Sequence, residues 1–354
     1  MNASNVVKAV LASVKDNKKP TVYFVVNVDG ETLTKDYENP GDSILIEYLR
    51  EYEYNDMISA FKQNGFGLKI FYNENDFINY VIKNTKELEQ LEPIVFNLAR
   101  NGKGLNKKAL IPAFCNFSDI SITGSGAYHV CLGRHKYHVN SLLRSHGIPV
   151  ANSWLYTKNG WLMGKTPPKD LRIIAKPAFE SASRGISSNS IAFVKDGIEE
   201  MLQDVCKKFK QDVIVQEFIS GYEVGVPVII DSRPYPLLSV GVSMGSDDAM
   251  GDKIITFDDA FNETYSFYNF SEKKPKISEG LQQSAIEAAM LLGLEQYCRI
   301  DFRVKLDGSF YIMDTSTHPF IIKHSAFAFA FNELGFSFSD LFAYLVYQRQ
   351  LKHN

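Results

Sequence analysis

The chain has 354 residues, of which 45% are hydrophobic and 22% are charged, and its formal net charge is −3. This length allows two or three domains, and this balance is typical of an ordinary globular protein. The weak negative charge argues against a nucleic-acid-binding role, since proteins of that class usually carry a basic stripe. No stretch approaches the ~20 consecutive apolar residues that cross a bilayer, so we expect no membrane partner.

The cysteines and the N-terminus indicate a cytoplasmic protein. The four cysteines lie far apart and form no Cys-x-x-Cys pair, which predicts reduced thiols. Lys8 and Lys15 interrupt the apolar residues near the N-terminus, so that segment does not have the features of a signal peptide. Lys103, Lys107 and Lys108 form a local run of positive charge, which we expect to be a solvated surface.

Strands and helices alternate in the first third of the chain. Residues 21–27, 68–72 and 94–98 have the composition of buried strands, while 43–65 and 76–91 have the apolar spacing of helices. Such alternation predicts a parallel sheet in an open α/β domain.

The rest of the chain is richer in expected strands. A helix over 127–146 should end at Gly147, a C-terminal cap that Pro149 follows. Residues 160–166 resemble a P-loop, but the glycines are one residue too close, so we interpret the segment as a hairpin-like turn. The remaining expected elements are strands at 153–158, 160–163, 171–176, 190–194, 213–218, 223–231, 236–245, 299–305 and 310–314, helices at 197–209, 278–292 and 339–351, and a loop at 246–259.

A polyphosphate site is the first chemical feature of the sequence. A β-branched strand delivers Lys176 to a loop of small residues, 180–186, in which an ammonium and backbone N–H groups lie close together. A second strand ends at Glu217, and Glu223 follows shortly after it. Backbone groups at this hinge can pair with an adenine edge, and the Glu223 carboxylate can accept hydrogen bonds from ribose hydroxyls.

Two expected strands near the C-terminus carry Asp301 and Asp314. If these strands are neighbours, each presents one carboxylate on the same face of the sheet. Mg²⁺ prefers oxygen ligands and binds between carboxylates and nucleotide phosphates. His318 and His324 follow the second strand, and for them substrate contact and core packing both stay open.

These features occur in a fixed order: the lysine with its loop, the hinge with its carboxylate, and then the two acidic residues. This order resembles the ATP-grasp superfamily and, within it, the D-alanine–D-alanine ligase family. Further landmarks of that family match 96–99, 123–125, Lys136, 147–149 and 334–338. The resemblance implies an α/β protein with an ATP-grasp fold behind an N-terminal open α/β domain. It divides the chain into an N-terminal domain (1–125), a central ATP-grasp lobe (126–215) and a C-terminal lobe with the metal and catalytic residues (216–354).

The resemblance also implies a role for each matching residue. Lys136 and Lys176 would hold nucleotide phosphates, and Ser183 would cover the transferred phosphate. Arg299 would stabilise the acyl-phosphate and the tetrahedral intermediate. The other implied positions are the adenine slot at Gln216, Glu217 and Ile219, the ribose ligand Glu223, and the metal ligands Asp301, Asp314 and Ser316.

ATP and Mg²⁺, with Mn²⁺ as an alternative metal, are the implied cofactors, and small carboxylates and amines are the implied partners. Whether the protein forms a homodimer is left open by the sequence.

The sequence departs from the family pattern mainly on the substrate side. Phe320 stands where the family has glycine, and Arg100 stands where it has an acidic residue. We therefore expect an ATP-dependent carboxylate–amine ligase that acts on a different amino acid or small acid, and Arg100 with Arg184 favours an acidic one. D-alanine–D-alanine ligation for cell-wall synthesis and a catalytically inactive ATP-binding regulatory module are the alternative hypotheses.

Overall fold

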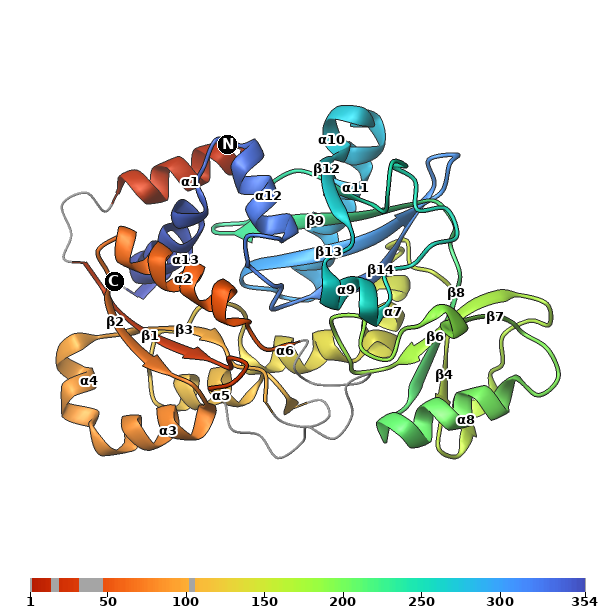
Figure 1. The fold of residues 1–354 in the computed structure, drawn as a ribbon, viewed down its shortest axis with the longest axis horizontal. Coiled ribbons are helices and arrows are strands. Elements are labelled where there is room, and N and C mark those ends of the chain that lie inside the picture. The colour runs from red at the N-terminus through yellow and green to blue at the C-terminus, as the bar shows by residue number, and fades with distance from the viewer. Residues whose placement is uncertain (1, 14–18, 32–46, 102–105, 354) are drawn as a thin grey trace.

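The computed structural model describes residues 2–13, 19–31, 47–101 and 106–353. In this part of the chain the strands form three sheets, of which the N-terminal one is parallel and the other two are antiparallel. Figure 1 shows the parallel sheet at the left and the two antiparallel sheets one above the other at the right.

The N-terminal sheet has the order β2-β1-β3, and both pairings are parallel, as predicted. Parallel neighbours need crossover connections, and helices supply them here. The elements are α1 (Ala3–Ala12), β1 (Thr21–Val26), α2 (Glu51–Gln63), β2 (Gly67–Phe71), α3 (Glu74–Lys83), α4 (Thr85–Leu91), β3 (Ile94–Leu98) and α5 (Leu110–Phe117).

The central sheet has the order β5-β4-β8-β6-β7. The segment that resembles a P-loop begins with strand β5, which pairs with β4 as a hairpin, and continues into a short 3-10 helix at Leu162–Gly164. The hairpin is thus present, but its turn precedes this segment. The elements are α6 (Ala127–Arg134), α7 (Lys136–Ser145), β4 (Ser153–Thr157), β5 (Gly160–Trp161), β6 (Arg172–Pro177), β7 (Ile191–Phe193), α8 (Ile198–Phe209) and β8 (Val213–Glu217).

The C-terminal sheet has the order β12-β11-β9-β13-β14, and β10 pairs with β9. Its two long strands, β9 and β13, pair along their full length, and β14 forms one edge. The elements are β9 (Tyr222–Ile230), β10 (Pro234–Pro236), β11 (Val240–Ser243), α9 (Phe257–Asn262), β12 (Ser266–Asn269), α10 (Phe270–Lys273), α11 (Pro275–Leu291), β13 (Gln296–Val304), β14 (Phe310–Ser316), α12 (Ala326–Glu333) and α13 (Phe338–His353).

Two predicted helices are each divided in the structure. The helix expected over 127–146 is broken at His135, whose φ of −89° and ψ of 84° are not helical. The His135 Nδ1 atom lies 3.4 Å from the backbone nitrogen of His138 and accepts its hydrogen bond, so His135 caps a new helix. The helix expected over 76–91 is likewise divided at Asn84.

Other boundaries also differ from the prediction. The helix expected over 43–65 begins at Glu51, and residues 43–46 lie outside the described residues. Helices α1, α5 and α12 and strand β12 were not predicted, and α9 begins inside the segment expected to be a loop.

The largest core joins the two ends of the chain. Phe342 of α13 packs against Phe61 of α2 and Phe96 of β3, with ring centroids 5.0 and 5.3 Å apart. Figure 1 shows α13 beside α2 against the N-terminal sheet. The C-terminal helix therefore stabilises the N-terminal sheet, while the division at residues 125 and 215 stays a prediction.

Truncation of Phe342 should destabilise the protein strongly. Its side chain is fully buried among aromatic rings, so Phe342→Ala leaves a cavity and should lower the free energy of unfolding by about 3–5 kcal/mol. Phe117, which is 89% exposed, is the matched control, and Phe117→Ala should change that free energy by less than about 0.5 kcal/mol. Urea unfolding measures both variants, and equal effects would contradict this account of the core.

Candidate active site

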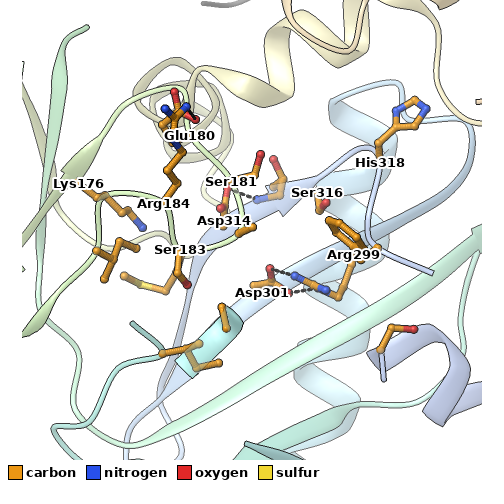
Figure 2. Close-up of a pocket in the computed structure, with 18 of the residues that line it drawn as sticks. Lys176, Glu180, Ser181, Ser183, Arg184, Arg299, Asp301, Asp314, Ser316 and His318 are labelled. Atoms are coloured by element: carbon orange, nitrogen blue, oxygen red, sulfur yellow. Dashed lines mark hydrogen bonds and ion pairs between the residues drawn. The ribbon is translucent and has the colours of Figure 1, made fainter. Parts of the chain in front are cut away.

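A cleft of about 520 Å³ brings together side chains from all parts of the chain. Figure 2 shows part of its lining, with residues of the central loop facing residues of the C-terminal sheet. The predicted site residues that line the cleft are Lys136, Lys176, Ser183, Ile219, Glu223, Arg299, Asp301, Asp314 and Ser316.

The pairing of β13 with β14 sets the centre of the site. Asp301 lies directly opposite Asp314, and Arg299 lies opposite Ser316. Arg299 and Asp301 are two residues apart in one strand, so their side chains share a face. The Arg299 Nε and NH2 atoms lie 2.6 and 2.9 Å from the two Asp301 oxygens. Burial alone would lower the pKa of Arg299, but the Asp301 carboxylate outweighs it and raises this pKa.

Lysines from two other elements act on the second carboxylate, one by direct contact and one through its charge. Lys136, the first residue of α7, places its Nζ atom 2.5 Å from Asp314 Oδ2. Burial alone would raise the pKa of Asp314, but Lys136 and Lys176 together hold it below its usual value. Burial lowers the pKa of Lys176 to about 8; Asp314 acts against this shift, and the positive charge of Lys136 adds to it.

The loop after β6 turns sharply towards the cleft. Ala182 and Ser183 have φ values of 53° and 56°, a left-handed conformation that is uncommon for residues other than glycine. Glu180 anchors the loop by accepting hydrogen bonds from Arg184 at 3.2 Å and from Gln211 at 2.8 Å. This turn is what brings Ser183 to the lining of the cleft (Figure 2).

Gln216 and Glu217 are not among the lining residues of the cleft. Gln216 lies inside the central sheet between two neighbouring strands and is fully buried. The Glu217 carboxylate accepts a hydrogen bond from Asn152 at 2.8 Å. Of the predicted adenine and ribose residues, Ile219 and Glu223 therefore have side chains at the cleft, and the adenine role of the others stays a prediction.

The expected solvated surface around Lys107 and Lys108 was a wrong prediction. Both side chains are buried, and their Nζ atoms lie 2.5 and 2.8 Å from the oxygens of the buried Glu47 carboxylate. A buried carboxylate needs such partners, and burial alone would raise the pKa of Glu47. Instead the surrounding cations, led by Lys107 and Lys108, hold it well below its usual range. Lys103 lies outside the described residues.

Arg100 is also paired within the protein. Its NH1 atom lies 3.8 Å from Glu47, and its NH2 atom donates to the His318 carbonyl at 3.2 Å. The guanidinium lies over the ring of Phe320, 4.3 Å from the ring centroid. The two departures from the family pattern, Arg100 and Phe320, are therefore in contact as a cation–π pair.

Several lining residues were missed by the sequence analysis. Arg134 ends α6 beside the helix break, and only its closeness to Lys136 in the sequence could have pointed to it. Tyr265 and Phe267 lie with ring centroids 5.0 and 5.1 Å from that of His324, and all three line the cleft. These aromatic residues are far from His324 in the sequence, so only the folded structure shows that they contact it.

The donor set at the centre of the cleft fits a hard divalent cation. Among the described residues, no three His, Cys, Asp or Glu side chains gather as a complete metal site. Asp301 and Asp314 supply two opposed carboxylates, and Ser316 adds a hydroxyl on the same strand as Asp314. Mg²⁺ typically uses one or two carboxylates and completes its shell with substrate phosphates and water.

Comparison with known proteins identifies the family. The model of the family described as "D-ala D-ala ligase C-terminus" matches residues 142–347, which is more than half of the chain. The chain belongs to the D-alanine–D-alanine ligase family. It is thus an ATP-grasp carboxylate–amine ligase. The family uses ATP and a divalent metal ion and joins small substrates.

Individual relatives agree with this family. The D-alanine–D-alanine ligase of Syntrophotalea carbinolica is 27% identical over 259 residues, which cover 72% of this chain and 79% of the relative. The D-alanine–D-alanine ligase of Leptospira biflexa is 28% identical over 258 residues, which cover 69% of each chain.

The crystal structure of the Bacillus anthracis D-alanine–D-alanine ligase complexed with ATP has a TM-score of 0.69 at 16% identity. It covers 94% of this chain and 98% of its own, which shows that the two ligases share the ATP-grasp fold. Among the described residues of this family member, no helix is long and apolar enough to span a membrane.

Nucleotide affinity should depend on the charge of Lys176. Its pKa of about 8 means that it is cationic below that pH and neutral above it, and a phosphate binds the cation better. The affinity for Mg-ATP should therefore be constant up to about pH 7.5 and then fall by up to about tenfold per pH unit. In Lys176→Arg the side chain stays charged, so titration calorimetry should give a much flatter profile. The same decline in both proteins would contradict this assignment.

Removal of the buried Glu47 charge should destabilise the fold. In Glu47→Gln the buried lysines lose their counter-charge, and the free energy of unfolding should fall by about 3–5 kcal/mol. The exposed pair Lys273–Asp248 is the control, and Asp248→Asn should lower the same quantity by less than about 1 kcal/mol. Urea unfolding compares the two variants, and a small effect of Glu47→Gln would mean that Glu47 is not ionised there.

Proposed function

We propose that this chain forms an amide or peptide bond between a small carboxylic acid and an amine, with ATP driving the reaction through an acyl-phosphate. We further propose that the acid is an amino acid or small acid other than D-alanine. The observation that supports the chemistry is the pair of opposed carboxylates, Asp301 and Asp314, with Arg299 on one side and Lys136 and Lys176 on the other.

The proposed reaction has two steps, and side chains of the cleft act in each. In the first step, a carboxylate oxygen of the substrate attacks the terminal phosphorus of ATP, and ADP leaves. Lys136 and Lys176 hold the nucleotide phosphates, and the loop with Ser183 covers the phosphoryl group that moves. A divalent cation held by Asp301, Asp314 and Ser316 would offset phosphate charge when it is bound.

In the second step, the amine attacks the carbonyl carbon, the bond to the phosphoryl oxygen breaks, phosphate leaves, and the amine loses a proton. Negative charge develops on the carbonyl oxygen, and Arg299 is the cation that lines the cleft there. Asp301 engages the Nε and NH2 atoms of Arg299, and no described residue accepts a hydrogen bond from NH1. The ion pair thus fixes the plane of the guanidinium and leaves one nitrogen for the substrate.

The substrate side supports an altered acid. The family pattern has glycine where this chain has Phe320, and a phenyl ring fills space that glycine leaves open. The Arg100 guanidinium lies over that ring, which fixes its position. D-alanine–D-alanine ligation remains the second candidate, because the family match extends over residues 142–347.

A substrate screen tests the proposal. Amino acids of both hands should be supplied singly and in pairs with Mg-ATP, and ADP release should require both an acid and an amine. Hydroxylamine should trap the activated acid as a hydroxamate when the amine is left out. Robust ADP release with D-alanine alone would favour the second candidate, and ADP release without any acid would contradict the acyl-phosphate route.

Arg299→Gln should impair chemistry more than nucleotide binding. Loss of one preorganised cation at a developing oxyanion lowers kcat by about 10²–10³-fold. Arg233→Gln, which changes an exposed arginine in the turn between β9 and β10, is the matched control and should keep full activity. Steady-state ADP release gives kcat, and calorimetry gives the affinity for ATP, which should change by less than about threefold. A larger loss of ATP affinity than of kcat would move Arg299 to the nucleotide side.

A further inference from the structure

We propose that a group of buried cations beside the phosphate loop binds an anionic group of the acid substrate, so that this acid carries a second negative charge in addition to the carboxylate that is activated. The group, called here the buried cation cluster, consists of Arg100, Lys107, Lys108 and Arg134 around Glu47. This inference rests on the proposed function and names the substrate class.

The cluster holds more positive charge than its neighbours balance. Glu47 is the carboxylate that the cluster surrounds. A second carboxylate, Glu180, pairs with Arg184 at 3.2 Å, and the charge of Lys107 also lowers its pKa against the effect of burial. With Arg184 included, five cations therefore face two carboxylates. Unbalanced charge of one sign in a buried place is unfavourable, and an incoming anion would relieve it.

One donor of the cluster has no partner among the described residues. Arg134 is 7% exposed and lines the cleft, and its NH2 atom donates to the Phe179 carbonyl. Its Nε atom is buried without a hydrogen-bond partner. Buried donors of this kind are rare in folded proteins, because an unpaired one loses its hydration without compensation. A ligand oxygen would satisfy it.

Lys108 supports the same conclusion. Its backbone adopts a left-handed conformation with a φ of 70°. Its Nζ atom lies 2.8 Å from a Glu47 carboxylate oxygen and 2.8 Å from the Ser181 hydroxyl. Burial lowers its pKa well below the usual value, and the charges of Arg100, Arg134 and Lys107 add to this shift against the effect of Glu47. A further anion beside Lys108 would act in the same direction as Glu47 and favour the charged form of this lysine.

The position of the cluster favours the acid rather than the nucleotide. Arg100 contacts Phe320 and the His318 carbonyl, which both lie in the segment directly after β14. This segment belongs to the proposed substrate side of the site. The residues proposed for the nucleotide phosphates, Lys136 and Lys176, are associated instead with Asp314. Arg100, Lys108 and Arg134 line the same cleft as Arg299, so a substrate held by Arg299 can extend towards them.

The chemistry of the cluster selects anionic oxygens. A guanidinium and an ammonium bind a carboxylate or a phosphate by charge-assisted hydrogen bonds. A dicarboxylic amino acid and a phosphorylated amino acid both present such a group, and the two sources are separated by experiment.

The test compares acids that differ in this second charge. ADP release is measured with aspartate and glutamate against asparagine and glutamine, and with O-phosphoserine against serine, in both stereochemical forms and with a panel of amines. At least one charged acid should have a KM that is lower by a factor of at least about ten than that of its neutral analogue, as one charge-assisted pair implies. If the aspartate or glutamate pair shows this difference, the recognised group is a carboxylate; if the O-phosphoserine pair shows it, the group is a phosphate.

Substitution of Arg134 connects the preference to the cluster. Arg134→Gln should raise the KM of the preferred acid about tenfold or more, while the KM of the neutral analogue and that of ATP change less than about twofold. Arg134→Lys, which keeps the charge, should restore most of the preference. Arg144→Gln is the matched control, because Arg144 also lies in the last turn of a helix and donates to a backbone carbonyl but lies outside the cleft.

Two results would overturn the inference. Equal KM values for charged and neutral acids would do so while the ligase function stands. A loss of ATP affinity in Arg134→Gln, without a change in acid preference, would assign the cluster to the nucleotide. If no acid–amine pair releases ADP, the proposed function is wrong, and calorimetry with the same acids then decides the inference: binding of charged acids that requires Arg134 supports the anion site, and its absence refutes it.

Discussion

The antiparallel pairing of β13 with β14 is the constraint on which the rest of the site depends. It places Asp301 directly opposite Asp314, and like charges in that arrangement destabilise a sheet. Three cations from different elements compensate them: Arg299 from β13 itself, Lys136 from α7 and Lys176 from β6. The two carboxylates thereby link the C-terminal sheet to the central sheet and to the helix that precedes it.

The break between α6 and α7 puts one of these cations at the start of a helix. Lys136 is the first residue of α7, and its ammonium meets Asp314 there. Beyond the other end of α7, the Pro149 carbonyl accepts a hydrogen bond from the Ile312 amide of β14 at 2.9 Å. Helix α7 is thus attached to β14 near both of its ends, so the pairing of β14 also positions the lysine.

Local features of the sequence were sufficient for much of the fold and for the centre of the site. Composition predicted β1, β3, β13 and β14, and it placed Asp301 and Asp314 on two strands that would present them on the same face of the sheet. The positions of Asp301 and Asp314 on neighbouring strands followed once those strands were assumed to pair. These features depend on residues that are close together in the sequence, such as the alternating side chains of a strand, so they can be recognised without the structure.

The features that sequence analysis missed depend on partners far away in the chain. Lys107 and Lys108 have the composition of a solvated surface, and only the three-dimensional contact with Glu47 shows that they are buried. The stacking of Arg100 on Phe320 likewise joins residues far apart in the sequence. The division at His135 depends on a side-chain cap, which the helical pattern on either side conceals.

The ion pairs of the cleft also limit how a nucleotide can bind. Lys136 neutralises Asp314 in this structure, and on our proposal the same ammonium contacts the phosphates. One ammonium cannot fully neutralise both anions, and Lys176, which also acts on Asp314, is shared with the phosphates in the same way. Another positive charge at Asp314 would therefore stabilise the loaded site. A divalent cation that enters with the nucleotide would supply that charge, which gives a physical reason for ATP and metal to bind this pair of strands together. The same exchange means that part of the attraction between Lys136 and phosphate replaces an ion pair already present, so the affinity for ATP is smaller than the number of cations in the cleft suggests.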